Sequence, residues 1–303
     1  MSSSPLVWIF KFAARLPLRA LHRLGSAVGR GTYLLSGKYA ARLRENLALS
    51  LTLSPREREQ PPTAEFRELL HTSIAEAGKA LVELPWVWLR PLAEVTGSVR
   101  ACHGWEHVEA ARAKGRGIIF LTPHLGCFEV SALYAAEHMP ITVLYRPPKL
   151  IWLEQVVRGG RERGQLRLAR TDVSGVRLLY KALKRGEAIG LLPDQVPGRG
   201  EGEWANFFGR PAYTMTLVGR LVESSGATML MAYAERLPAG AGYVIRIAPL
   251  EFAPARSATE QMNAALEAVI RACPAQYLWS YNRYKTPAGV APFGEKLQSE
   301  DSA

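Results

Sequence analysis

The chain has 303 residues, of which 48% are hydrophobic and 21% charged, so a folded core is expected and disorder is disfavoured except at the ends. Its net charge of +11 favours anionic partners, namely nucleic acid, anionic lipid or an acidic carrier protein, unless the basic surface is an ordinary one. The three cysteines (Cys102, Cys127 and Cys273) are too scattered for a disulfide framework or a zinc motif, and they indicate a reducing compartment.

The N-terminus combines apolar side chains with a regular series of basic ones. Residues 1–44 contain eight Lys or Arg residues and no Asp or Glu. A helix over residues 5–24, capped by Ser2–Ser4 and kinked at Pro17, would carry one basic stripe, formed by Lys11, Arg15, Arg19 and Arg23. Such regular charges argue against a simple spanning helix and against a secretory signal. We expect an amphipathic helix in the plane of an anionic membrane, with a core-packed helix or a tilted span as alternatives.

The rest of the chain indicates one α/β domain. A second helix is expected over residues 39–60, ending near Ser54, followed by a loop over 57–63 and a helix over 64–84. Strands and helices then alternate, which predicts a sheet covered by helices on both faces. The expected strands are 117–121, 141–145, 188–192, 228–233 and 243–250, and the expected helices are 128–138, 151–163, 173–185, 214–225 and 258–272. We divide the chain into a membrane-associating helical segment (1–38), the α/β domain (39–293) and a flexible tail (294–303).

The segment GRGIIFLTPHLGCFE, residues 115–129, places a histidine just after a strand. Thr122-Pro123 ends the apolar strand, because proline cannot donate a hydrogen bond to a ladder. His124 would then lie at the carboxyl end of the strand, where ligand sites of open α/β sheets gather. Glu129, one turn into the next helix, could bond one ring nitrogen while the other takes a proton from a hydroxyl. This spacing also arises by coincidence, so the pair alone does not identify an enzyme.

Six blocks of sequence resemble, in the same order, those of a known family. They are HLGCFE (124–129), YRPPK (145–149), Gly160-Arg161, LLPDQ (191–195), FFGRPAYTMT (207–216) and PAQYLWSYNRYK (274–285). Over residues 40–290 the chain resembles the bacterial lipid A secondary (late) acyltransferases, the lauroyl/myristoyl transferase family within the lysophospholipid acyltransferase group. It departs from many members at Cys127-Phe128, where they have Asn-Trp, and it lacks the uninterrupted spanning helix of some relatives.

The resemblance implies an acyltransferase-like α/β fold and an O-acyltransferase acting at the cytoplasmic face of the bacterial inner membrane. The expected reaction moves a fatty acyl chain from acyl carrier protein, or acyl-CoA, to a hydroxyl of a lipid A precursor. No metal, cofactor or covalent acyl-enzyme is expected. His124 would be the general base, and Glu129 would orient it.

The resemblance also implies roles for further residues. The thioester oxyanion would be stabilised by backbone N–H groups near 125–127 or by Arg161. The acidic carrier protein and the phosphorylated acceptor would be bound by Arg146, Arg161 and Arg210, and Asp194 would orient an arginine or bind the acceptor. An apolar pocket lined by the helix that starts at Phe128 and by the N-terminal helices would set the acyl length.

Three alternatives stay open. The acceptor could be another hydroxylated lipid, such as an ornithine lipid, a lysophospholipid or a glycolipid. Cys127 and His124 could form a thioesterase. A non-enzymatic membrane- or nucleic-acid-binding module would explain the basic N-terminus, but no nucleic-acid motif is present and we expect no nucleic-acid partner.

Overall fold

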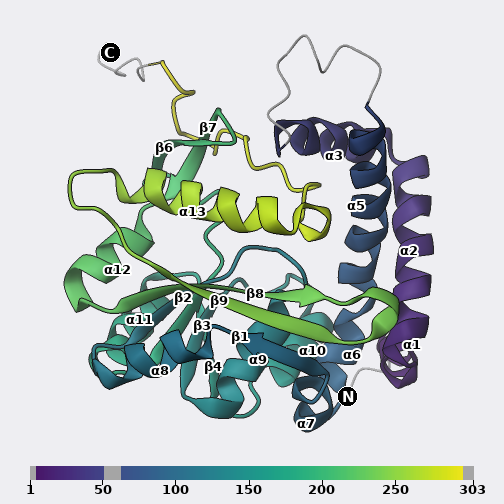
Figure 1. Cartoon of the computed structure of the whole chain (residues 1–303), viewed down its shortest axis with the longest axis horizontal. Coiled ribbons are helices and arrows are strands. Elements are labelled where there is room, and N and C mark those ends of the chain that lie inside the picture. Colours follow the sequence, from purple (N-terminus) through teal and green to yellow (C-terminus); the bar gives the residue numbers. More distant parts are fainter. Residues whose placement is uncertain (1–4, 51–62, 296–303) are drawn as a thin grey trace.

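A seven-stranded mixed sheet forms the centre of the molecule, and helices cover both of its faces (Figure 1). This computed structural model describes residues 5–50 and 63–295. The strand order is β1-β9-β8-β2-β5-β3-β4, and β6 and β7 form a separate antiparallel hairpin. The strands are β1 (Val99–His103), β2 (Ile118–Leu121), β3 (Ile141–Tyr145), β4 (Leu166–Arg170), β5 (Ala188–Leu191), β6 (Gly202–Phe207), β7 (Arg210–Met215), β8 (Thr228–Arg236) and β9 (Tyr243–Leu250).

The helices belong to two layers and an N-terminal group. The described α-helices are α1 (Pro5–Arg15), α2 (Leu18–Leu35), α3 (Gly37–Ser50), α5 (Ala64–Val82), α6 (Leu84–Leu89), α7 (Leu92–Thr96), α8 (Trp105–Ala113), α9 (Phe128–His138), α10 (Ile151–Arg161), α11 (Val173–Lys184), α12 (Leu217–Ser225) and α13 (Ala258–Ala272). Two 3₁₀ turns, η1 (Pro238–Gly240) and η2 (Pro274–Gln276), follow β8 and α13.

The central strands are apolar on both faces. Ile119 and Leu121 of β2 face one core, which contains residues of α11, α12 and α13. Ile118 and Phe120 face the other core, which contains residues of α6 to α10. A strand buried on both sides needs apolar residues at successive positions, which explains the unbroken IIFL run. In Figure 1, α13 lies on one side of the sheet, and α8 and α9 lie on the other.

The α/β class and the N-terminal helices predicted from the sequence are confirmed. The helices expected over 128–138 and 258–272 have the same bounds in the structure, whereas the one expected over 214–225 begins at Leu217, because its first residues complete β7. The strands β1 and β4, the β6–β7 hairpin and the helices α6 to α8 were not among the predicted elements. Ser2–Ser4, the predicted helix end near Ser54 and most of the tail 294–303 lie outside the described residues.

The N-terminal segment is two helices and not one kinked helix. Pro17, with φ −65° and ψ 146°, separates α1 from α2, since its ring and missing N–H disrupt a helix. The helix α2 packs closely along α5. A Cβ on Gly29 would lie only 2.1 Å from the carbonyl oxygen of Ile74, so the position requires glycine. Within the described residues, no helix has a stretch long and apolar enough to cross a membrane. The membrane association of residues 1–38 stays a prediction.

Candidate functional site

The loops that follow β2 and β5 bring His124 and Asp194 together. The two strands are parallel neighbours, with Leu121 opposite Leu191, so their carboxyl ends lie at the same edge of the sheet. His124 Nδ1 is 2.8 Å from Asp194 Oδ1, and the backbone N–H of His124 donates to Asp194 Oδ2 at 2.9 Å. One carboxylate therefore holds both the ring and the backbone of His124.

The buried carboxylate of Asp194 selects the tautomer of the histidine ring. The side chain of Asp194 is 2% exposed and that of His124 is 16% exposed. Burial opposes ionisation of Asp194, but its electrostatic interaction and hydrogen bonds with His124 hold the pKa of Asp194 below its ordinary value. An ionised Asp194 accepts a hydrogen bond from Nδ1–H, which leaves a free electron pair on Nε2 of the neutral ring of His124. This is the tautomer that a general base requires.

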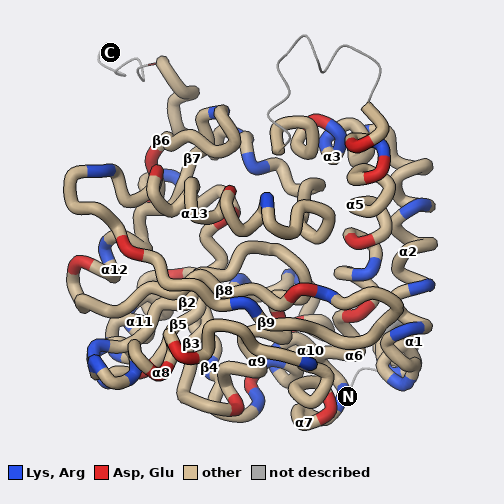
Figure 2. Tube along the Cα trace, viewed as in Figure 1, with Lys and Arg blue, Asp and Glu red and all other residues tan. Residues whose placement is uncertain are grey.

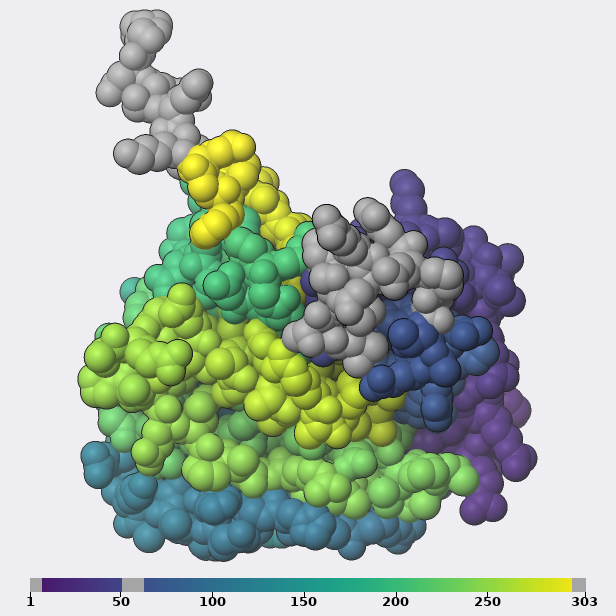
Figure 3. Space-filling model, turned by 45° about the horizontal axis from the view of Figure 1, so that its top comes forward, coloured from purple at the N-terminus to yellow at the C-terminus, as the bar shows by residue number. Residues whose placement is uncertain are grey.

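The C-terminal block that begins at Pro274 supports the pair. In Figure 3 this yellow segment lies between the green β6–β7 hairpin and the blue α5. Leu278 N donates to the carbonyl oxygen of His124 at 3.0 Å. Burial, and then the charge of Asp194, raise the pKa of Tyr277 well above its ordinary value, so a protonated hydroxyl lies near the carboxylate. Asp194 therefore positions His124, whereas the sequence suggested that it binds the acceptor or an arginine.

Gly126 allows the loop after His124 to approach the sheet. Its φ is +59°, and a Cβ there would lie 2.0 Å from the carbonyl oxygen of Ala234. Gly126 N donates to the carbonyl oxygen of Gln276 at 3.1 Å, and Cys127 N donates to that of Ala234 at 2.9 Å. The glycine of the HLGCFE block is thus required by this close approach.

Glu129 does not orient the histidine in this structure. The two ring nitrogens of His124 have other neighbours, Asp194 at Nδ1 and Gln195 at Nε2. Glu129 instead accepts two hydrogen bonds from Nε of Arg161, at 3.0 and 2.8 Å, and a further one from its Nη2. The predicted contact between Glu129 and His124 is therefore wrong, because the loop after β5 supplies the carboxylate that bonds the ring.

The Gly160-Arg161 block builds a charged wall beside this site. A Cβ on Gly160 would lie 2.4 Å from Cβ of Trp88, so a glycine is needed for α10 to pack here. The guanidinium carbon of Arg161 lies 5.9 Å from the centroid of the Trp88 ring. Burial disfavours the charge of Arg161, but Glu129 more than compensates and raises its pKa.

A cavity of about 940 Å³ opens beside His124. Its size falls within the roughly 300–1,000 Å³ typical of small-ligand pockets. Much of its wall is apolar and comes from both faces of the sheet, including Phe120, Leu133, Val143, Leu168, Met215 and Ile247. The Glu129–Arg161 pair also lines it. Phe128 lines the cavity as expected. Among the described residues, however, helices α1, α2, α3 and α5 contribute none of the lining, so the predicted contribution of the N-terminal helices is wrong.

Of the three arginines predicted to bind ligands, two line the cavity. Arg146, after β3, and Arg161 are among its lining residues. Arg210 instead pairs with Glu45 at 2.7 Å and lies over the Tyr284 ring, 4.4 Å from its centroid, which favours a structural role. Two further arginines that sequence reasoning missed also line the cavity, Arg177 of α11 and Arg220 of α12. Nothing in the local sequence distinguishes them from ordinary arginines on helix surfaces.

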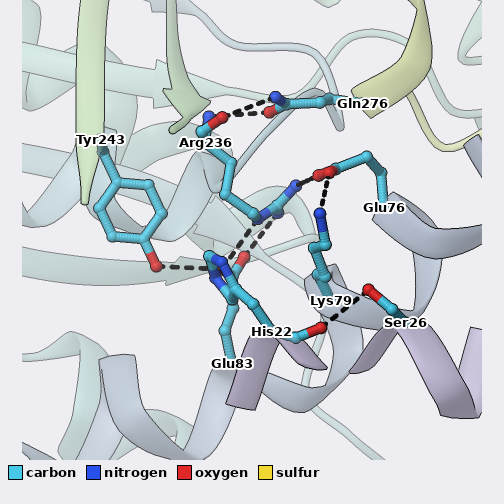
Figure 4. Close-up of polar contacts among 8 residues, drawn as sticks. All are labelled: His22, Ser26, Glu76, Lys79, Glu83, Arg236, Tyr243 and Gln276. Carbon is cyan, nitrogen blue, oxygen red and sulfur yellow. Dashed lines mark hydrogen bonds and ion pairs between the residues drawn. The ribbon is translucent and has the colours of Figure 1, made fainter. Parts of the chain in front are cut away.

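A buried ionic cluster connects the N-terminal helices to the sheet behind the site (Figure 4). Arg236, at the end of β8, donates to both oxygens of Glu83, at 2.9 and 2.6 Å, and to Glu76 at 2.8 Å. The Tyr243 hydroxyl and His22 Nε2 lie 3.0 and 3.1 Å from Glu83 Oε2. The two strand residues Arg236 and Tyr243 are paired across β8 and β9. The cluster thus fixes α2 and α5 to the end of β8.

Cys127 faces this cluster and not the reacting side of His124. Its side chain is 2% exposed. Burial, and then the negative charge of Glu83, raise the pKa of its thiol well above the ordinary value. A nucleophilic cysteine needs an accessible thiolate, so the Cys127–His124 thioesterase finds no support in this geometry.

The fold and the site define an α/β protein with a histidine–aspartate pair beside an apolar cavity, an arrangement suited to acyl transfer. Residues 5–286 match the model of the bacterial lipid A biosynthesis acyltransferase family, and the chain belongs to this family of acyltransferases. It is similar to three Escherichia coli K12 proteins. It is 28% identical to a lipid A biosynthesis lauroyltransferase (94% of this chain, 91% of the relative). It is 30% identical to a palmitoleoyltransferase (94% and 90%) and 25% identical to a myristoyltransferase (86% and 82%) of the same pathway.

Proposed function

We propose that this protein transfers a fatty acyl chain from an acyl carrier protein thioester, or from acyl-CoA, to a hydroxyl of a lipid A precursor. The observation that carries the proposal is the His124–Asp194 pair beside an apolar cavity of about 940 Å³. The relatives are named for the transfer of lauroyl, palmitoleoyl and myristoyl chains in lipid A biosynthesis. An apolar cavity binds fatty chains because their transfer out of water is favourable.

The proposed chemistry is direct transfer. The acceptor hydroxyl gives its proton to Nε2 of His124 as its oxygen attacks the thioester carbonyl carbon. Asp194 stabilises the imidazolium that forms, because it is ionised and bonded to Nδ1. The C–S bond then breaks, and the leaving thiolate takes the proton from Nε2. The reaction as proposed uses no metal, cofactor or covalent acyl-enzyme.

The arginines of the cavity suit anionic ligands. Arg146, Arg177 and Arg220 line it, and guanidinium groups bind phosphate through charge-assisted hydrogen bonds. We infer that they bind the phosphorylated acceptor or the acidic carrier protein. The Glu129–Arg161 pair fixes the wall next to His124, and we propose that it orients the acyl donor there.

We propose that the protein works on the cytoplasmic face of the bacterial inner membrane, in contact with anionic lipid. Trp8, Ile9 and Phe12 of α1 are 66%, 60% and 65% exposed, which is unusual for large apolar side chains. Lys and Arg residues lie along α1 and α2 (blue in Figure 2). Apolar side chains beside cations are the combination that holds a helix at an anionic interface.

Mass spectrometry of a purified reaction tests the function. The protein is incubated with lauroyl, myristoyl or palmitoleoyl carrier protein and a diglucosamine-phosphate lipid that bears hydroxylated fatty chains. We expect the acceptor mass to increase by the mass of one fatty acid less that of one water. Parallel reactions use acyl-CoA as donor and ornithine lipid, lysophospholipid or glycolipid as acceptor. Acylation of ornithine lipid, lysophospholipid or glycolipid without acylation of the diglucosamine-phosphate lipid contradicts the proposal. Release of free fatty acid as the only product also contradicts it.

A further inference from the structure

Gln195 occupies the position that the acceptor hydroxyl needs. Its side-chain Nε2 lies 3.2 Å from Nε2 of His124, within the cavity lining. A hydroxyl that gives its proton to His124 must come within about 2.6–3.2 Å of the same nitrogen. Acceptor and Gln195 therefore cannot both bond His124 in the observed way.

The tautomer of His124 determines the direction of this contact. Asp194 accepts a hydrogen bond from Nδ1–H, so Nε2 of the neutral ring of His124 is an acceptor. The Gln195 amide must therefore donate, and in the absence of substrate it covers the electron pair of the base. When a hydroxyl takes this place, the amide loses its acceptor and needs another one in the cavity.

The backbone of Gln195 is held on both sides. Asp194 is buried and bonded to His124, and Val196 N donates to the Tyr281 hydroxyl at 3.0 Å. The Gln195 side chain itself is half-buried. A displaced amide is thus confined to the immediate surroundings of Nε2, where the thioester carbonyl must also lie.

The backbone oxyanion donors expected from the sequence are already occupied. Leu125 N, Gly126 N and Cys127 N each donate to a backbone carbonyl, at 2.7, 3.1 and 2.9 Å. Arg161 bonds Glu129 through Nε and Nη2, which fixes its guanidinium at the wall of the cavity. The three backbone groups would have to break existing bonds to stabilise an oxyanion, whereas Gln195 is released by the arrival of the acceptor.

We propose that Gln195 is a catalytic residue, whose amide covers Nε2 of His124 at rest and donates a hydrogen bond to the thioester oxyanion during transfer. This inference rests on the proposed function. As the acceptor oxygen bonds to the carbonyl carbon, the C=O electron pair moves onto oxygen, and Gln195 N–H donates to it. When the C–S bond breaks, the carbonyl re-forms and the amide returns to Nε2.

Two substitutions and a matched control test the role in kinetics. Gln195→Leu removes the donor at similar size, and we expect kcat to fall by about 10²-fold while the KM of both substrates hardly changes, because the lost bond forms only in the transition state. Gln195→Glu places a carboxylate beside the protonated ring and should move the acid limb of the pH–rate profile to higher pH. Gln165→Leu, at an exposed position before β4, should behave as wild type.

A Gln195→Leu variant with wild-type or higher kcat overturns the proposal, because the amide would then only obstruct the base. A substrate-free measurement separates this outcome from failure of the proposed function. In ¹⁵N NMR of selectively labelled histidine, we expect Gln195→Leu to shift the Nε2 signal of His124 and to leave Nδ1 protonated. An unchanged Nε2 signal also overturns the inference. A wild-type enzyme that transfers no acyl chain counts against the function alone.

Discussion

His124 and Asp194 should be the most sensitive residues of the site. We expect His124→Ala to lower the transfer rate by roughly 10²–10⁴-fold, the usual cost of losing a general base, without unfolding the protein. Asp194→Asn should come close to this loss, because an amide no longer selects the Nδ1–H tautomer. Single-turnover rates with saturating acceptor, and circular dichroism to verify folding, measure both effects.

Glu129→Gln is the matched comparison for Asp194→Asn, since each change replaces a buried carboxylate by an amide. We expect Glu129→Gln to be milder, because the amide keeps its size and one acceptor for Arg161 while the His124–Asp194 bond is untouched. A larger loss in Glu129→Gln than in Asp194→Asn would restore Glu129 as the residue that orients the histidine.

His124 and Asp194 show how much of the site can be predicted from the sequence alone. The sequence identified His124 from its position after an apolar strand, whereas Asp194 was expected only to orient an arginine or bind the acceptor. Their pairing depends on β2 and β5 being neighbours, although about 70 residues separate the two side chains in sequence. Sequence proximity favoured Glu129 instead, because adjacency of strands is a property of the sheet order and not of any local pattern.

At the scale of elements, the ionic cluster around Glu83 fixes α2 and α5 to β8. Removing one partner of a buried ion pair costs about 3–5 kcal/mol, and we expect Glu83→Gln to lower the free energy of unfolding by about 3 kcal/mol, since Glu76 still binds Arg236. The control Glu94→Gln breaks an exposed pair with Arg90 and should cost less than about 1 kcal/mol. Urea unfolding measures both.

The same carboxylate predicts an acid limit of stability. Burial opposes the ionisation of Glu83, but Arg236 and His22 lower its pKa from 4.5 to about 2. The unfolded chain binds the proton below about pH 4.5 and the folded chain does not, so this contribution is complete above pH 4.5 and is lost as the pH falls toward 2. Stability of Glu83→Gln should depend less on pH over this range. An equal slope in both proteins would assign acid unfolding to other groups.

The helix α9 should control the length of the transferred chain. Ala132 lines the cavity one turn along α9 from Phe128, whose ring lies 4.9 Å from that of His124. Ala132→Phe should therefore fill the space farther from the base and shift the preference toward shorter acyl chains. Competition between carrier proteins that bear chains of different length measures this. Ala110→Phe, on an exposed position of α8, is the control, and an unchanged preference in Ala132→Phe would place the end of the chain elsewhere.

At the scale of the whole molecule, the basic N-terminus should govern binding to anionic vesicles. The four cations of the predicted stripe are exposed, but Pro17 divides them between α1 and α2. Each contributes on the order of 1 kcal/mol near an anionic surface, so changing all four to Gln should weaken binding by at most about 4 kcal/mol, and less at high salt. The residues are Lys11, Arg15, Arg19 and Arg23.

Flotation with anionic and neutral vesicles at two salt concentrations measures this loss. A control with four exposed cations of the α/β domain changed to Gln keeps the same net charge: Lys114, Arg167, Lys181 and Lys184. If both variants lose vesicle binding to the same extent, the loss comes from the reduced net charge and not from the N-terminal position of the cations. If the N-terminal variant floats like the wild type at both salts, then α1 and α2 are not an electrostatic anchor, and the core-packed alternative gains support from the contact of α2 with α5.

The support of His124 by the C-terminal block has a consequence for how the enzyme is made. During translation, the strand that precedes His124 leaves the ribosome long before Leu278, whose amide holds the His124 carbonyl. Domains fold as their chains emerge, so a nascent chain can pair β2 with β5 while the His124 carbonyl still lacks its hydrogen bond from Leu278. Catalytic competence therefore arrives last, with the final part of the chain. A truncated translation product that ends before Pro274 would keep the residues that line the cavity but would lack the hydrogen bond that holds the backbone of His124.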